Sequence, residues 1–419
     1  MRSDGRELRE QRDHEEKSKV SDLALFGGVK MFAEPQHVGR PNIGDRKRLI
    51  SRIEDMLDRC WLTNNGKYVQ EFEREVAVLL GAKHCIATCN GTVALEIAIR
   101  AAGLSGEVIV PSFTFVATAH ALQWQAIVPV FSDIDPETHN IDPAAVMRLI
   151  TPRTTGIIGV HVWGRPCDID GLTAIAQERN LALIFDAAHA FGCSYKGKMI
   201  GNFGLAEVFS FHATKFLNSF EGGAVVTNDE RLAKTVRLMT NFGFAGYDDV
   251  VYVGTNGKMN EASAAMGLTS LESFEDFITV NRRNYDAYQR EFADVPGVRL
   301  IEYPERERGN YQYVIIEIDS EAFRLSRDEL RQVLWAENIL VRRYFYPGCH
   351  RMQPYRSLFP HAGLVLPATE ALVERTLCLP TGTSFGVSEV RAICGLIRFA
   401  SEHATEVRRR LERNQRGGI

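Results

Sequence analysis

The sequence lacks the features that mark membrane, secreted and nucleic-acid-binding proteins. No run approaches the roughly twenty apolar residues of a membrane helix, and the stretch from Met1 to about Val20 has no apolar segment of a signal peptide. The eight cysteines are scattered, without the spacing of a secreted disulfide framework or of a zinc site. The formal net charge of -4 argues against general phosphate binding. We therefore expect a cytoplasmic protein that binds no membrane, nucleic acid or metal.

The composition that is present is that of a two-lobed globular protein. The chain has 419 residues, of which 45% are hydrophobic and 24% charged, and this length favours two unequal lobes. We expect a polar tail over 1–25, a large α/β domain over 26–303 and a smaller α+β domain over 304–419. The predicted fold class is α/β, with a large, mostly parallel sheet covered on both faces.

Short apolar runs alternate with helical patterns through the large domain, as a parallel sheet requires. In the small domain, the pattern predicts a strand over 311–318, a helix over 327–337, a strand over 340–343 and a long helix from about Ser388. The strands predicted for the large domain cover 85–88, 108–110, 128–131, 156–160, 181–185, 208–211 and 223–227.

Two charged residues follow predicted strands at the edge where open α/β sheets bind ligands. Asp186 follows 181–185 and could face a planar cationic ligand, and Lys215 follows 208–211, where desolvation would lower the pKa of its amine. Taken singly, such an Asp is more often a helix cap and such a Lys is more often solvated. His161 and Trp163 follow a further strand, and we expect both to pack at the domain surface.

Six blocks, in order, resemble the DegT/DnrJ/EryC1/StrS sugar aminotransferases, a branch of the fold-type I enzymes that use pyridoxal 5'-phosphate (PLP). The resemblance runs from about Phe26 to Ile397. The blocks are Asn90-Gly91-Thr92-Val93-Ala94-Leu95, Pro111-Ser112-Phe113-Thr114-Phe115, Asp186-Ala187-Ala188-His189-Ala190, Phe209-Ser210-Phe211-His212-Ala213-Thr214-Lys215, Glu221-Gly222-Gly223-Ala224-Val225-Val226-Thr227 and Gly254-Thr255-Asn256-Gly257-Lys258-Met259.

The resemblance implies roles for the cofactor-binding residues. Lys215 matches the lysine that binds PLP covalently and moves the proton during catalysis. Asp186 matches the partner of the pyridine nitrogen, and Phe115 matches the ring stacked on the pyridine, although a plain core Phe is a competing interpretation. The implied phosphate ligands are Gly91 and Thr92 at a helix start, Ser210, and Asn256 reaching into a neighbouring subunit, so a homodimer with shared active sites is implied.

Two positions depart from the commonest family pattern. His189 stands where most members have Gln beside the phenolic oxygen of the cofactor, so its protonation could add a pH dependence. Lys258 stands where Arg is usual and lacks its bidentate fork. We expect Lys258, and His350 of the small domain, to contact substrate.

The implied reaction moves the amino group of L-glutamate onto a nucleotide-linked keto-deoxysugar, with PLP cycling through pyridoxamine 5'-phosphate. The blocks look most like those of members that aminate C4 of a dTDP-4-keto-6-deoxyhexose. Three alternatives remain open at this point. They are a 3-keto sugar aminotransferase, a sugar dehydratase on the same fold, whose members replace the lysine by histidine, and a non-catalytic PLP-binding regulator.

Overall fold

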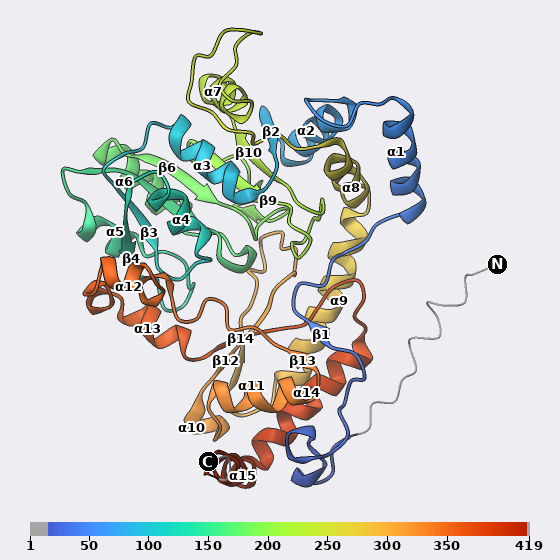
Figure 1. Ribbon diagram of the computed structural model, residues 1–419. Coiled ribbons are helices and arrows are strands. Elements are labelled where there is room, and N and C mark those ends of the chain that lie inside the picture. Colours follow the sequence, from blue (N-terminus) through green and yellow to red (C-terminus); the bar gives the residue numbers. More distant parts are fainter. Residues whose placement is uncertain (1–15, 417–419) are drawn as a thin grey trace.

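The computed structural model describes residues 16–416, with the side chains of 414–416 left aside, and has two lobes joined by a long helix (Figure 1). Helix α9 (Phe274–Phe292) runs from one lobe into the other. Its first turns, at Phe274 and Phe277, belong to the core of the large lobe, whereas Tyr288 and Phe292 belong to the core of the small lobe. The predicted domain limits remain a prediction. No helix among the described residues has both the length and the apolar character needed to cross a membrane.

The large lobe is built on a seven-stranded sheet in the order β2-β10-β9-β6-β5-β3-β4. All strands run parallel except β10, which pairs antiparallel with both of its neighbours. The strands are β2 (His84–Thr88), β3 (Glu107–Pro111), β4 (Val128–Ser132), β5 (Thr154–Val160), β6 (Ala182–Asp186), β9 (Ala206–Ser210) and β10 (Gly223–Thr227). All seven predicted strands are present, and the predicted α/β class is confirmed.

Helices cover both faces of this sheet because successive strand side chains point to opposite sides. Ile184 packs towards one face and Phe185 towards the other. The first face carries α3 (Gly91–Ala101), α4 (Ala117–Gln123) and α7 (Glu230–Thr240); the second carries α2 (Lys67–Leu80), α5 (Pro143–Leu149), α6 (Ile169–Arg179) and α8 (Glu261–Glu272), with α1 (Arg46–Asp58) against α8. Helix α2 ends at Gly81, which has the left-handed φ of 67° typical of a helix C-cap.

The small lobe contains an antiparallel sheet in the order β11-β12-β14, packed against α9, α11 and α14. Its strands are β11 (Val298–Leu300), β12 (Val314–Ile318) and β14 (Thr376–Leu379), and its helices are α10 (Ser320–Phe323), α11 (Arg327–Ala336), α14 (Val387–Glu402) and α15 (Ala404–Arg416). The connection before β14 carries α12 (Tyr355–Leu358), whose Tyr355 packs on Phe131 of β4 in the large lobe, and α13 (Pro367–Val373). The short strands β1 (Gln36–His37) and β13 (Ile339–Leu340) pair with each other, as do β7 (Ser194–Tyr195) and β8 (Lys198–Met199).

The N-terminal segment over 20–32 packs onto the small lobe. Val20 and Leu23 are buried in the same apolar cluster as β12 and α14. Residues 1–15 of the expected polar tail lie outside the described part of the chain.

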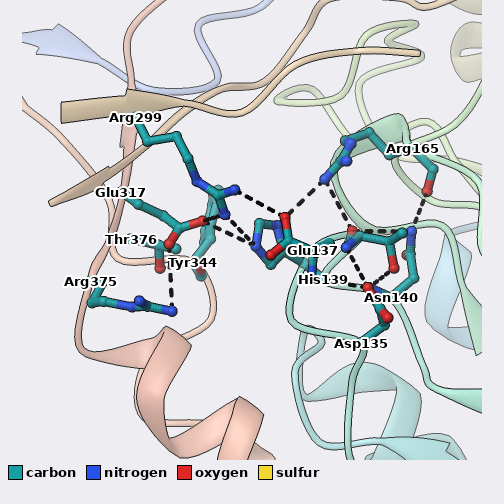
Figure 2. Close-up of polar contacts among 11 residues, drawn as sticks. Asp135, Glu137, His139, Asn140, Arg165, Arg299, Glu317, Tyr344, Arg375 and Thr376 are labelled. Carbon is teal, nitrogen blue, oxygen red and sulfur yellow. Dashed lines mark hydrogen bonds and ion pairs between the residues drawn. The ribbon is translucent and has the colours of Figure 1, made fainter. Parts of the chain in front are cut away.

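A buried ion cluster joins the two lobes (Figure 2). Glu317 on β12 accepts a hydrogen bond from Arg299 on β11 at 2.5 Å, and its carboxylate lies 3.1 Å from Nε2 of His139 in the turn after β4. Burial alone would raise the pKa of Glu317, but the hydrogen bonds from His139 and Arg299 lower it to about 2. The cluster therefore fixes the small lobe against the strand-end loops of the large sheet.

Candidate active site

The predicted cofactor residues come from the carboxyl edge of the large sheet. Asp186 is the last residue of β6 and Ser210 the last of β9, two strands that are adjacent in the sheet. Lys215 follows five residues after Ser210, and Gly91 begins α3, which packs against β9 and β10. The topology thus brings segments that are far apart in sequence to one edge.

The carboxylate of Asp186 is held on both of its oxygens. Oδ2 accepts a 2.9 Å hydrogen bond from the hydroxyl of Thr118, and Oδ1 accepts a 3.1 Å bond from the backbone N–H of Ala188. Thr118 is fully buried on α4, and its hydroxyl lies 3.0 Å from that of Thr114. Sequence reasoning missed Thr118, although its position just after the Pro111–Phe115 block places it beside the site.

The amine of Lys215 is electrostatically coupled to Asp186. Burial lowers the pKa of Lys215 to about 8, and the negative charge of Asp186 opposes the decrease. At pH 7 roughly a tenth of an amine with this pKa is unprotonated, far more than of a lysine at its usual pKa of about 10.4, and this fraction can act as a nucleophile.

His189 lies close enough to the same amine to interact with it electrostatically. Burial, and then the charge of Lys215, hold the pKa of His189 well below its usual value. The ring lies parallel to Phe345 at 5.7 Å between centroids and tilts against Tyr313 at 4.4 Å. Its Nδ1 accepts a 3.2 Å hydrogen bond from the backbone N–H of Trp163.

The expected surface position of His161 and Trp163 is wrong, because both side chains are buried. His161 lies under β6, where its Nε2 is 3.1 Å from Glu207 and its Nδ1 is 3.1 Å from the thiol of Cys167. Burial would lower the pKa of His161, but these two groups raise it to about 10. The polar neighbours come from β9 and from the loop after β5, and no local sequence pattern reveals such pairings.

The start of α3 lies close to Ser210. A Cβ atom placed on Gly91 would come within 2.8 Å of Cβ and 3.2 Å of Oγ of Ser210. The side chain of Asn90 caps the helix by accepting the N–H of Val93, and the first backbone N–H groups of any helix, here those of Gly91 and Thr92, have no intrahelical acceptor. A serine hydroxyl beside a helix N-terminus is a donor set for an anion.

Phe115 and Asn256 are open to solvent in the single chain. The ring of Phe115 is 57% exposed and lines a groove of about 300 Å³ shared with the small lobe. Asn256 is exposed in the segment before α8, and the next residue, Gly257, accepts a backbone hydrogen bond from Cys89 at 2.7 Å. The proposed stacking and cross-subunit roles remain predictions.

The two predicted substrate contacts already have partners within the chain. The amine of Lys258 donates to Asn241 at 2.9 Å and lies over the ring of Phe242. His350 is buried, with Nδ1 2.6 Å from the hydroxyl of Ser112 and Nε2 2.7 Å from Glu370. The structure does not bring either residue into direct contact with Lys215 or Asp186, and their roles remain predictions.

Comparison with known proteins identifies the family of the chain. The sequence model of the DegT/DnrJ/EryC1/StrS aminotransferase family matches residues 44–398. The chain belongs to this family. Its members and structural neighbours are PLP-dependent aminotransferases, so the protein is an aminotransferase of fold type I.

Two relatives and one solved structure illustrate the likeness. The dTDP-4-amino-4,6-dideoxy-D-glucose transaminase of Shigella dysenteriae is 38% identical over 87% of this chain and 99% of its own. The GDP-perosamine synthase of Escherichia coli O157:H7 is 34% identical over 82% of this chain and 92% of its own. A structure named "Crystal Structure Analysis of DesI in the presence of its TDP-sugar product" has a TM-score of 0.91 and 50% identity, covering 94% of this chain and 100% of that chain.

The residues at this edge fit the cofactor of the family. The space between Gly91 and Ser210 admits no side chain at position 91, which leaves backbone N–H groups for a phosphate. The carboxylate of Asp186 suits a protonated ring nitrogen, and Lys215 offers an amine whose pKa is lowered. His189 offers a ring N–H for an oxygen acceptor.

Proposed function

We propose that the protein transfers the amino group of L-glutamate, by way of PLP held at Lys215, to C4 of a dTDP-linked 4-keto-6-deoxyhexose. The observation that carries the proposal is the coupling of Lys215, Asp186 and His189 at the carboxyl edge of the sheet. The substrate class follows from the names of the relatives, which include a dTDP-4-amino-4,6-dideoxy-D-glucose transaminase and a structure with a TDP-sugar product.

The residues of the chain divide the work of the reaction. When bound, PLP supplies a carbon that takes up the donor's nitrogen and a ring that delocalises the electron pair left on the donor carbon. Lys215 holds the cofactor and moves a proton between Cα of the donor and C4′ of the cofactor. Asp186, oriented by Thr118 and Ala188, pairs with the proton on the ring nitrogen.

The phosphate is held by Gly91, Thr92 and Ser210, and the partner copy of the chain completes the site with its own Asn256. An exposed apolar surface on the segment that leads to Asn256 supports the dimer, because large apolar patches mark interfaces. The exposed residues of this segment are Phe242, Phe244, Tyr247, Val250, Val251, Tyr252 and Val253. We place the reaction in the cytoplasm, which agrees with eight free cysteines.

The test separates the two halves of the reaction. The protein loaded with PLP should show a visible absorption band that fades when L-glutamate is added, and Lys215→Ala should lack the lysine-linked band. A dTDP-4-keto-6-deoxyhexose should then restore the band and be aminated at C4. Amination at C3, or turnover only with a GDP-linked keto sugar, would show that the substrate part is wrong. A band that glutamate leaves unchanged would refute the assigned donor.

A further inference from the structure

The hydrogen bond on Nδ1 of His189 determines where the ring carries its proton. A neutral imidazole has one nitrogen that donates and one that accepts. Because Nδ1 accepts the backbone N–H of Trp163 at 3.2 Å, the proton must lie on Nε2. Nε2 makes no hydrogen bond with residues 16–416 and is free to donate to a ligand.

The surroundings of the ring disfavour a second proton. The facing groups are the side-chain nitrogen of Lys215, the phenol of Tyr313 and the apolar ring of Phe345, none of which is an anion that would favour a charged imidazole. Asp186, the nearest carboxylate along the chain, is already bonded to Thr118 and to a backbone N–H. A proton on Nδ1 would also remove the acceptor of the Trp163 N–H.

The loop that supplies this N–H is fixed from several directions. Asn140 accepts the N–H of Val162 at 3.0 Å and donates to the carbonyl of Pro166 at 3.1 Å. It also donates to the carbonyl of Arg165 at 3.1 Å (Figure 2). The hydroxyl of Tyr303, from the small lobe, donates to the carbonyl of Trp163 at 3.1 Å. Trp163 itself has the left-handed φ of 57°, which costs energy for a non-glycine residue and therefore needs such support.

The indole of Trp163 connects this loop to the ion cluster between the lobes. It is 1% exposed and packs edge-on against Phe113 at 5.4 Å and His139 at 5.6 Å. His139 is the residue that reaches Glu317 across the lobe junction (Figure 2). The loop is thus held between the interlobe cluster on one side and His189 on the other.

We propose that residues 162–166 form a positioning loop, held by Asn140, whose Trp163 N–H fixes His189 as a neutral Nε2–H donor towards the oxygen on the cofactor ring. The identity of that acceptor rests on the proposed function, whereas the protonation state belongs to the chain itself. A neutral ring N–H acts as the amide N–H of glutamine does, so this loop accounts for histidine at a position where the family pattern has Gln. The pH dependence expected from the sequence for His189 is then absent.

Nuclear magnetic resonance of the full-length, PLP-loaded protein labelled with ¹⁵N-histidine tests the protonation state. The signals of His189 are assigned by their loss in His189→Gln. We expect one protonated nitrogen, Nε2, and one bare nitrogen, Nδ1, with shifts unchanged over about pH 6–8, where free histidine titrates. A titration midpoint within that range, or a proton on Nδ1, would overturn the proposal.

Asn140→Ala tests the positioning role of the loop. Without this clamp, we expect the ¹⁵N shifts of His189 to move towards the average of the two tautomers and the pKa of His189 to rise towards about 6.5. The matched control is Asn202→Ala, which removes an asparagine that likewise bridges two carbonyls, those of Leu80 and Met199, at the opposite edge of the sheet. Shifts as unperturbed as in this control would refute the role of Asn140.

Tyr303→Phe gives a second, milder perturbation should Asn140→Ala fold poorly. It removes the hydroxyl that donates to the Trp163 carbonyl, and a smaller shift in the same direction is expected, whereas no shift would count against the loop. The visible band distinguishes the two proposals. Intact His189 shifts in a protein that does not react with glutamate would refute the proposed function and leave the loop assignment standing.

Discussion

Replacing Gly91 by alanine should weaken PLP binding, because the new methyl group would collide with the strand that carries Ser210. The added Cβ would lie 2.8 Å from Cβ and 3.1 Å from Cα of Ser210, whereas carbon atoms in contact prefer about 3.5–4.0 Å. The start of α3 and the end of β9 must therefore separate by roughly 0.7–1.2 Å. Neither group is the flexible end of a long side chain, so the backbone has to move.

Overpacking of this kind costs about 1–3 kcal/mol of folding stability, and it displaces the proposed phosphate donors, whose hydrogen bonds to a charged group are worth about 1.5–3 kcal/mol each. We expect the dissociation constant of PLP to rise about 10- to 100-fold, since each 1.4 kcal/mol is about tenfold. Titration of the cofactor-free protein with PLP, followed by fluorescence quenching, measures the change. Gly395→Ala is the matched control, because a Cβ there has no neighbour within 4 Å and alanine favours a helix.

A double variant separates the steric effect of the added methyl group from the loss of the Ser210 hydroxyl. Ser210→Gly removes the Cβ that a methyl group at position 91 would strike, so Gly91→Ala with Ser210→Gly should regain thermal stability. It should still bind PLP weakly, because the Ser210 hydroxyl is missing. An unchanged PLP affinity in a folded Gly91→Ala protein would refute the account of a closed phosphate cradle.

Three further results are expected. Capture of PLP by the cofactor-free protein should accelerate as pH rises through about 8, the pKa of Lys215, because only the unprotonated amine reacts; a rate that is flat from about pH 6 to 9 would contradict this. Thr118→Val removes the 2.9 Å bond to Asp186, worth about 1.5–3 kcal/mol, so the glutamate half-reaction should slow about 10- to 100-fold, whereas Thr173→Val on α6 should change little. Glu317→Gln should destabilise the protein at pH 7 by up to roughly 3 kcal/mol, because lowering the pKa from 4.5 to about 2 stabilises the fold at about 1.4 kcal/mol per unit above the unfolded pKa. This contribution is lost as pH falls from about 4.5 towards 2. Denaturant curves should therefore show a smaller difference in free energy of unfolding between the variant and the wild type at pH 3 than at pH 7, and an equal difference would contradict the role of Glu317.

The large sheet could be predicted from the sequence because its strands are short apolar runs followed by polar residues. All seven were found with bounds within two residues of the observed ones. The strands of the small lobe were predicted less accurately from the sequence. The strand expected over 340–343 is only Ile339–Leu340, because pairing with β1 ends at Leu340 and Arg342 forms an isolated antiparallel bridge to Cys378 of β14 instead.

At the site, the sequence indicated which residues carry charge but not what holds them. Lys215 and Asp186 could be found because each follows an apolar strand. Thr118 and Trp163 could not be assigned their roles, since these depend on a hydroxyl from α4 and on a backbone N–H from a left-handed residue. Partners contributed by distant segments have no local signal, and neither has the junction of His139 with Glu317.

The position of β10 between β2 and β9 has a consequence for folding during synthesis on the ribosome. β2 pairs only with β10 in the sheet, yet Gly223, opposite Thr88, leaves the ribosome roughly 7–27 s later at about 5–20 residues per second. Through this interval the nascent chain carries a buried-type strand with both edges bare, an aggregation hazard that a chaperone can cover. Lys215 leaves the ribosome just before β10 does. The lysine that binds the cofactor therefore becomes available shortly before β10 can pair with β2 and β9 and complete the sheet.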